Sequence, residues 1–112
     1  MLKCIAIDDE PLALRQITGY ISKIPYLELS ATFNNAIDAQ QRLTEEPADL
    51  IFADINMPDL NGVDFVRALP DRPMVIFTTA YSEYAVEGFK LDAVDYLLKP
   101  FGFDEFNRAA QR

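Results

Sequence analysis

Residues 5–11 read IAIDDEP, so an apolar run ends abruptly in three consecutive carboxylates and a proline. The apolar part lacks the alternation of a strand with one exposed face, which predicts a strand covered on both faces. The proline suits the first turn of a helix. The three carboxylates therefore lie in a predicted loop between a buried strand and a helix, at the carboxyl end of that strand.

The same succession of short apolar runs and helical patterns continues along the chain. Apolar runs predict strands at residues 2–7, 50–53, 74–77 and 94–98, and the alternating residues 27–32 predict a strand nearer the sheet edge. Apolar residues spaced by three or four predict helices at residues 14–24, 36–43, 63–69, 82–89 and 103–110. This order predicts an α/β fold: a doubly wound, five-stranded parallel sheet with helices on both faces, in one domain spanning residues 1–112.

Polar residues end the predicted strands, and in such sheets ligands bind at the carboxyl ends of the strands, where the strand order reverses. These residues are Asp8, Asp9 and Glu10 after the first strand, Asp54 after the third, Thr78 and Thr79 after the fourth and Lys99 after the fifth. If the strand order is 2-1-3-4-5, the first and third strands are neighbours. Asp8, Asp9 and Asp54 then share one crevice, which Thr79 and Lys99 approach from its other side.

Carboxylates gathered in one crevice need a compensating cation. Two of them about 5 Å apart repel by roughly 3 kcal/mol at an effective dielectric near 20. Oxygen ligands without histidine favour Mg²⁺ over zinc or copper. Residues 8–10 alone could equally form a solvated loop at a helix N-terminus. That reading does not explain why Asp54, Thr79 and Lys99 end neighbouring strands in the same way.

Composition narrows the classes of function further. The chain has 10 basic and 18 acidic residues and a formal net charge of −8, which argues against sequence-independent binding to nucleic acid or anionic membranes. It has no histidine, which excludes histidine-based catalysis. Its one cysteine, Cys4, lies in the first apolar run and is expected to be a core residue. A lone thiol forms no internal disulfide, and neither a signal peptide nor a membrane span is expected, so the predicted location is the cytoplasm.

Asp54 is the candidate nucleophile, because a carboxylate at a strand tip can accept a phosphoryl group and form an aspartyl phosphate. Lys99 would neutralise the added negative charge. The hydroxyl of Thr79 would donate a hydrogen bond to a phosphoryl oxygen. The sequence contains no glycine-rich phosphate loop, so a nucleotide substrate is not expected.

Taken in order, these residues resemble the receiver domain of bacterial two-component response regulators. The resemblance rests on Asp8 and Asp9, on DINMP at residues 54–58 followed by Gly62, on TA at residues 79–80 and on KPF at residues 99–101. It covers essentially the whole chain. It implies the strand order 2-1-3-4-5 and a Mg²⁺-dependent transfer of a phosphoryl group from a histidine kinase to Asp54.

The resemblance also implies a metal site. Asp9 matches the direct metal ligand, and Asp8 matches the ligand that usually acts through water. Asp54 and the backbone carbonyl of Asn56 complete the set. Glu10, by contrast, is expected to serve the start of the first helix.

A second group of residues matches the part of the family's site that responds to phosphorylation. Thr79 and Lys99 match the pair that contacts the phosphoryl group, and Tyr96 matches an aromatic switch residue. The bond between Lys99 and Pro100 matches a peptide bond that is usually cis in receivers. Phosphorylation is expected to change the face formed by the fourth helix, fifth strand and fifth helix, whose aromatic residues suit a partner or a homodimer.

Residues 80–85 (AYSEYA) and 93–99 (AVDYLLK) are similar to receivers of the LytR/AlgR group. Those proteins commonly carry a C-terminal LytTR DNA-binding domain, which is absent from this chain. The fifth predicted helix also breaks off at Arg112. We therefore expect a truncated receiver of a longer transcription regulator, which contacts DNA only through the missing domain.

Three alternatives remain open. A degenerate or stand-alone receiver would act only as a binding module, although the complete acidic set and Lys99 argue against it. A Mg²⁺-dependent phosphatase of the haloacid dehalogenase type would need an Asp-x-Asp pattern after the first strand, and residues 8–10 do not provide it. A flavodoxin-type flavin protein is disfavoured by the acidic crevice.

Overall fold

The 112-residue chain is described by a computed structural model, in which residues 1–57, 62–69, 73–80 and 95–111 are placed. These residues form a parallel five-stranded sheet in the order β2-β1-β3-β4-β5. Its strands are β1 (Leu2–Ile7), β2 (Leu27–Phe33), β3 (Leu50–Asp54), β4 (Met74–Thr79) and β5 (Asp95–Leu98). The predicted fold class and the 2-1-3-4-5 order are confirmed.

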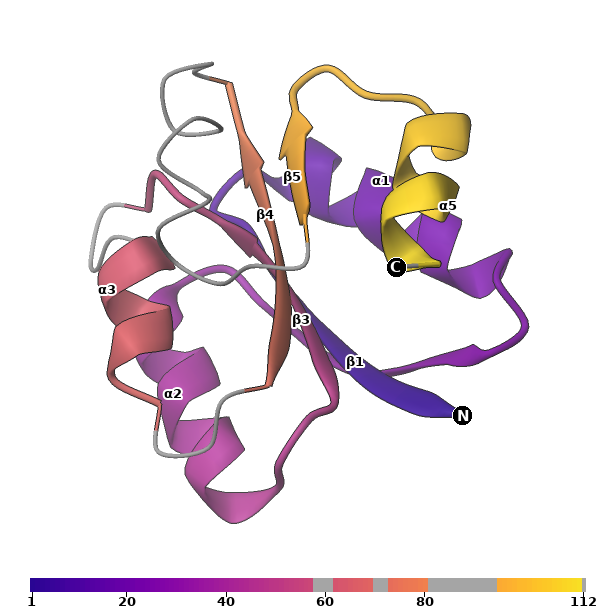
Figure 1. Ribbon diagram of the computed structural model, residues 1–112. Coiled ribbons are helices and arrows are strands. Elements are labelled where there is room, and N and C mark those ends of the chain that lie inside the picture. The colour runs from indigo at the N-terminus through magenta and orange to yellow at the C-terminus, as the bar shows by residue number, and fades with distance from the viewer. Residues whose placement is uncertain (58–61, 70–72, 81–94, 112) are drawn as a thin grey trace.

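Helices cover both faces of the sheet. The described helices are α1 (Pro11–Ser22), α2 (Ala36–Glu45), α3 (Gly62–Arg67) and α5 (Phe103–Ala110). Figure 1 shows α1 and α5 on one face and α2 and α3 on the other. The helix predicted at residues 82–89 lies outside the described residues. None of the helices in the described part of the chain combines the length and apolar character needed to cross a membrane.

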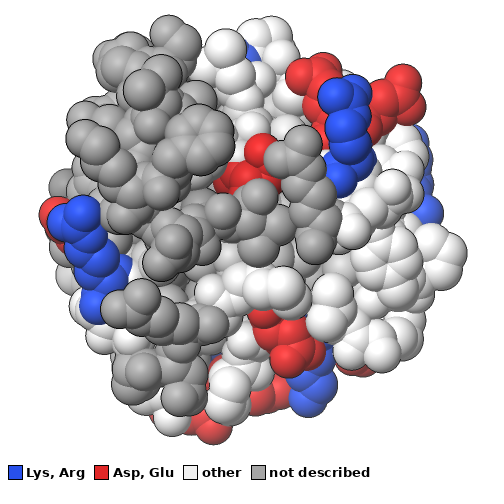
Figure 2. Space-filling view, viewed as in Figure 1, with Lys and Arg blue, Asp and Glu red and all other residues white. Residues whose placement is uncertain are grey.

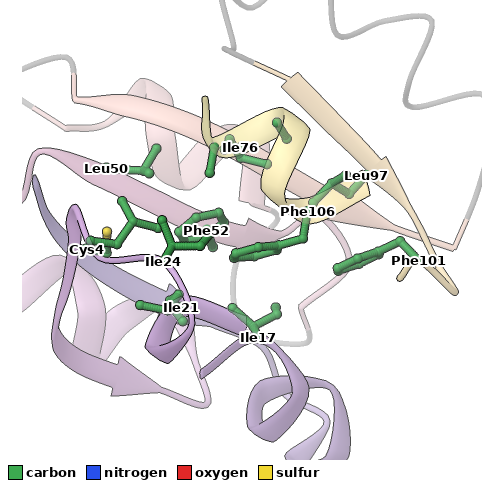
Figure 3. Close-up of a cluster of buried hydrophobic side chains, with 14 residues drawn as sticks. Cys4, Ile17, Ile21, Ile24, Leu50, Phe52, Ile76, Leu97, Phe101 and Phe106 are labelled. Carbon is green, nitrogen blue, oxygen red and sulfur yellow. The ribbon is translucent and has the colours of Figure 1, made fainter. Parts of the chain in front are cut away.

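Two hydrophobic clusters lie on opposite faces of the sheet, because successive strand residues point to opposite faces. Cys4, Phe52 and Ile76 belong to the cluster beneath α1 and α5, together with Ile17 and Phe106 of those helices (Figure 3). We call this the α1/α5 cluster. The other cluster, beneath α2 and α3, contains Ile5, Ile7, Ile51, Phe65 and Phe77, among others, and we call it the α2/α3 cluster.

Burial explains the apolar runs. All five residues of β3 are buried, since this strand lies at the centre of the sheet and has helices on both faces. In β2, by contrast, only Leu27 is buried, as predicted for an edge strand. Cys4 is fully buried, and this burial raises the pKa of its thiol to about 11. The expectation that Cys4 is a core residue is confirmed.

Surface charge agrees with the acidic composition. On the face shown in Figure 2, the described Lys and Arg side chains stand apart from one another, and no continuous basic patch appears among them. A basic patch is the usual footprint of a surface that binds the nucleic-acid backbone.

Candidate functional site

The carboxyl ends of the central strands bring together side chains that are far apart in the sequence. Asp8 directly follows β1, Asp54 ends β3 and Lys99 directly follows β5. The ammonium Nζ of Lys99 lies 2.9 Å from Asp8 Oδ2 and 3.5 Å from Asp54 Oδ2. The structure therefore places the predicted acidic residues and the predicted lysine in one site at the switch point of the sheet.

Lys99 is held by negative charge. Only 18% of its side chain is exposed, and a third carboxylate, Glu10, lies 3.9 Å from its Nζ. Burial alone would lower the pKa of Lys99. The hydrogen bond to Asp8 and the charges of Asp54, Asp8 and Glu10 outweigh burial and leave the pKa above its ordinary value. Lys99 is therefore a permanent cation in this site.

Asp54 has an unfavourable environment for its negative charge. The residue is 4% exposed, and burial together with the negative charge of Asp8 raises the pKa of its carboxyl to about 6. Lys99 and the backbone N–H of Asn56, which donates to Asp54 Oδ1 at 3.3 Å, offset part of this rise. A carboxylate that is short of compensating charge is suited to receive a cation or a phosphoryl group.

Asp8 is fully buried, whereas Asp9 and Glu10 are exposed. Asp8 Oδ1 accepts a hydrogen bond of 2.9 Å from the backbone N–H of Glu10, which fixes the loop between β1 and α1. One carboxylate oxygen from each of these three residues lies within 4.8 Å of the others. Oxygen-only ligands at this spacing fit a hard divalent cation such as Mg²⁺.

Glu10 lies at the start of α1, as expected, and its backbone carbonyl accepts a 3.0 Å hydrogen bond from the N–H of Leu14. Glu10 is the N-cap residue of α1, but its side chain makes no capping hydrogen bond. The start of the helix is provided by Pro11, which has no N–H to satisfy and a backbone angle already suited to a helix. The Glu10 carboxylate lies 3.9 Å from Lys99 Nζ and adds to the negative charge around that cation.

Thr79 and Tyr96 lie on the α2/α3 side of the same sheet edge. Thr79 ends β4 and is fully buried. The half-buried Tyr96 packs against the α2/α3 cluster, with its ring centroid 5.3 Å from that of Phe77. Because Thr79 follows Phe77 by two residues, strand alternation gives their side chains the same face. The structure thus brings the predicted threonine and the predicted aromatic residue to one side of the site.

The loop after Asp54 depends on a glycine. Asn56 is exposed two residues beyond Asp54, and the N–H of Gly62 donates a 2.8 Å hydrogen bond to the carbonyl of Ile55. A Cβ at Gly62 would collide with the Asp54 carbonyl oxygen and lie 3.0 Å from Ile55 Cα. No larger residue can stand at the start of α3 unless the backbone that carries Asp54 moves.

The peptide bond between Lys99 and Pro100 is cis. The N–H of Lys99 donates to the carbonyl of Thr79, which ties the residue after β5 to the end of β4.

Comparison with known proteins identifies the family. A family model described as the response regulator receiver domain matches residues 4–111. The chain belongs to the response regulator receiver domain family. The receiver resemblance seen in the sequence is therefore confirmed over nearly the whole chain. As a receiver, the chain is part of a two-component signalling system.

The relatives that are similar in sequence to this receiver include LytR. Transcriptional regulatory protein LytR of Staphylococcus aureus is 35% identical over 99% of this chain but only 46% of its own length. An uncharacterized response regulatory protein of Shewanella oneidensis is 37% identical over 100% of this chain and 48% of its own length. The chain thus spans about half the length of these relatives.

Solved structures agree on the fold. The response regulatory domain of mrkE from Klebsiella pneumoniae has a TM-score of 0.89 and is 34% identical, covering 98% of this chain and 93% of that one. The response regulator domain of CheB from Thermotoga maritima has a TM-score of 0.83 at 20% identity and covers 99% of this chain and 95% of that one. The second likeness concerns the fold alone.

Proposed function

We propose that this receiver accepts a phosphoryl group on Asp54. One observation carries the proposal: a buried carboxylate with a raised pKa lies beside a cation, Lys99, and a second buried carboxylate, Asp8, at the carboxyl edge of the sheet. A structural ion pair would need one carboxylate for one lysine, whereas this site holds an excess of negative charge.

The transfer would proceed by attack of an Asp54 carboxylate oxygen on the phosphorus of a phosphohistidine. The new P–O bond forms as the P–N bond of the donor breaks, and the imidazole nitrogen leaves with the electron pair. Lys99 Nζ, already 3.5 Å from Asp54 Oδ2, would neutralise the charge that the phosphoryl group adds. The reaction modifies the receiver itself, so the domain is a phosphoacceptor in a signalling pathway rather than an enzyme with a separate substrate.

Mg²⁺ is the proposed cofactor. Asp8, Asp9 and Asp54, with the backbone carbonyl of Asn56, would hold it, Asp9 directly and Asp8 through water. When bound, Mg²⁺ supplies positive charge that offsets the charge of the phosphoryl oxygens. The support for it is the oxygen-only chemistry of these donors, two of which, Asp8 and Asp9, lie with Glu10 in a group whose carboxylate oxygens are within 4.8 Å of one another.

Thr79 and Tyr96 would change position when Asp54 is phosphorylated. The Thr79 hydroxyl would donate a hydrogen bond to a phosphoryl oxygen, and Tyr96, packed on the same side of the sheet, would move into the space that Thr79 leaves. This would bias the face formed by the fourth helix, β5 and α5 toward a second packing. That face would bind a partner or a second copy of the chain.

The remaining parts of the proposal concern the whole protein. The partner that supplies the phosphoryl group would be a sensor histidine kinase in the cytoplasm, in keeping with a buried, unpaired thiol at Cys4. The output would be transcription through a LytTR-type DNA-binding domain outside this chain. The support is the similarity to LytR of Staphylococcus aureus, a transcriptional regulatory protein of which this chain covers 46%.

The test uses a small phosphodonor. The domain is incubated with acetyl phosphate, with Mg²⁺ or with EDTA, and its intact mass is measured beside that of an Asp54→Asn variant. The expected result is one phosphoryl adduct on the wild type with Mg²⁺, and none with EDTA or on the variant. Steady turnover of a generic phosphate ester without an adduct would favour a phosphatase and overturn the proposal. The absence of both would leave a binding module.

A further inference from the structure

A buried hydroxyl beside Asp54 has no role in the site described above. Thr78 is fully buried, with an exposed fraction of 0%. Its side-chain oxygen Oγ1 makes no hydrogen bond to any residue in the described ranges. A buried hydroxyl without a partner is unfavourable, and native proteins rarely retain one without a reason.

The sheet register places Thr78 next to the proposed phosphoacceptor. Thr78 is the direct neighbour of Asp54 across the β3–β4 pair and of Leu97 across the β4–β5 pair. Adjacent strands in a sheet lie about 4.8 Å apart. The backbone carbonyl of Thr78 also accepts a 3.0 Å hydrogen bond from the N–H of Ile55, so the residue after Asp54 is fixed to this point of β4.

The side chains of Thr78 and Asp54 share one face of the sheet. Phe52 and Ile76 both point into the α1/α5 cluster (Figure 3), and Asp54 and Thr78 each follow one of them by two residues. Strand alternation therefore directs both side chains to the α1/α5 side. Lys99 follows the buried Leu97 of that cluster by two residues, and its Nζ lies 3.5 Å from Asp54 Oδ2, which agrees with this direction for the Asp54 side chain.

Asp54 has room for another hydrogen bond. Among the described residues, the polar contacts of its two oxygens are 3.3 Å to the backbone N of Asn56 and 3.5 Å to Lys99 Nζ, both long for a charged acceptor. Each carboxylate oxygen can accept two hydrogen bonds. Rotation about the first side-chain torsion of Thr78 moves its hydroxyl between staggered positions without moving the backbone.

We propose that Thr78 is a positioning residue for Asp54: after rotation about its first side-chain torsion, the Thr78 hydroxyl would donate a hydrogen bond to the Asp54 carboxylate and set the direction of the attacking oxygen. The inference rests on the proposed role of Asp54 as phosphoacceptor. Thr78 differs in this from Thr79, which points to the opposite face and is assigned to the phosphoryl group itself.

The test compares variants at one position. Thr78→Val removes the hydroxyl and keeps the shape, Thr78→Ser keeps the hydroxyl, and Thr78→Ala is a second hydroxyl-free variant in case valine impairs folding. Thr32→Val, which removes an exposed hydroxyl from the edge strand β2, is the matched control. Phosphorylation by acetyl phosphate with Mg²⁺ is followed by intact mass. The ¹³C chemical shift of the Asp54 carboxyl is measured by NMR without phosphodonor.

Removing one hydrogen bond to a charged group should slow phosphorylation about ten- to a hundredfold in Thr78→Val and Thr78→Ala. Thr78→Ser and Thr32→Val should react like the wild type. The Asp54 carboxyl shift should move in the two hydroxyl-free variants only. A residue that merely fills the core would leave this shift unchanged and would lower stability when altered.

The outcomes separate this inference from the proposed function. If the wild type forms no adduct on Asp54, both fail. If the wild type reacts and Thr78→Val reacts equally fast with an unchanged carboxyl shift, only the role of Thr78 is overturned. Loss of rate in Thr78→Ser as well would also overturn it, because that variant retains the hydroxyl.

Discussion

Replacing Asp54 with asparagine should make the metal-free protein more stable near neutral pH, although it removes the proposed phosphoacceptor. Burial and the charge of Asp8 raise the pKa of Asp54 from 3.8 to about 6. At about 1.4 kcal/mol for each pKa unit, the ionised carboxylate destabilises the folded state by about 3 kcal/mol at neutral pH. Asparagine carries no charge and can still accept from the N–H of Asn56, although its own amide N–H groups need partners. We expect a net gain of about 1–2 kcal/mol in the free energy of unfolding.

The difference in stability between Asp54→Asn and the wild type should depend on pH. Between about pH 4 and pH 6 the folded wild type binds a proton at Asp54 that the unfolded chain has released. The free energy of unfolding contributed by this group therefore falls as the pH rises through that window. The advantage of Asp54→Asn should be complete above about pH 7 and should shrink toward zero near pH 4.

The assay is urea unfolding followed by circular dichroism, in EDTA, at several pH values. Glu28→Gln, which neutralises an exposed carboxylate on β2, is the control for the loss of one negative charge. Saturating Mg²⁺ should stabilise the wild type more than Asp54→Asn, by about 2.7 kcal/mol at a hundred times its dissociation constant. Equal or lower stability of Asp54→Asn in EDTA at neutral pH, or a gain that does not change with pH, would refute the reasoning.

Three further predictions concern the same site. Gly62→Ala should lower the free energy of unfolding by about 1–3 kcal/mol and slow phosphorylation, because the added methyl group would collide with the Asp54 carbonyl. Gly19→Ala is the control: a Cβ at this position in α1 meets open space, so urea unfolding should show a gain in stability of about 0.5–1 kcal/mol. Lys99→Met should destabilise the fold by roughly 3 kcal/mol and abolish the phosphoryl adduct, since it leaves Asp8 and Asp54 buried without their cation; unchanged unfolding curves would contradict this. Mg²⁺ affinity, measured by calorimetric titration, should fall as the pH drops below about 6 because protonation of Asp54 competes with the metal ion, and a flat profile would argue against Asp54 as a ligand.

Much of the fold could be predicted because the signals are local and repeated. Apolar runs without alternation predicted the covered strands, and the alternation in residues 27–32 predicted the edge position of β2. The strand ends were less accurate. Asp54 and Thr79 are the last residues of β3 and β4, whereas the predicted strands ended at residues 53 and 77. The backbone ladder continues past the apolar residues because Asp54 is paired with Thr78.

The strand order was enough to predict which residues share the site, but it did not predict the contacts between them. Strand order places Asp8, Asp54 and Lys99 at one edge, yet the reach of Lys99 to Asp8 across 91 residues of sequence depends on how deeply each side chain is buried. Glu10 is the N-cap residue of α1, as expected, but the contact of its carboxylate with Lys99 was not predicted, because that contact depends on where the lysine side chain lies. Thr78 ends the same apolar run as Thr79 but was given no role, because only the register of β3 and β4 relates its hydroxyl to Asp54.

Two described aromatic residues of the predicted partner face, Tyr96 and Phe103, are partly buried. The half-buried Tyr96 packs against the α2/α3 cluster, and Phe103 packs against the α1/α5 cluster beside Tyr20. The other aromatic residues of that face, at positions 81, 84 and 89, lie outside the described residues. Spacing along a helix or strand does not determine how much of a ring the neighbouring elements cover.

The central claim is that Asp54 carries the phosphoryl group, and chemical trapping tests it most directly. The domain is phosphorylated with acetyl phosphate and Mg²⁺ and treated with borohydride, which reduces an aspartyl phosphate to homoserine. Peptide mapping then locates the change. We predict homoserine at position 54 and unchanged aspartate at positions 8 and 9. Homoserine at either of those positions, or an unaltered Asp54 in a domain whose mass shows a phosphoryl adduct, would contradict the account.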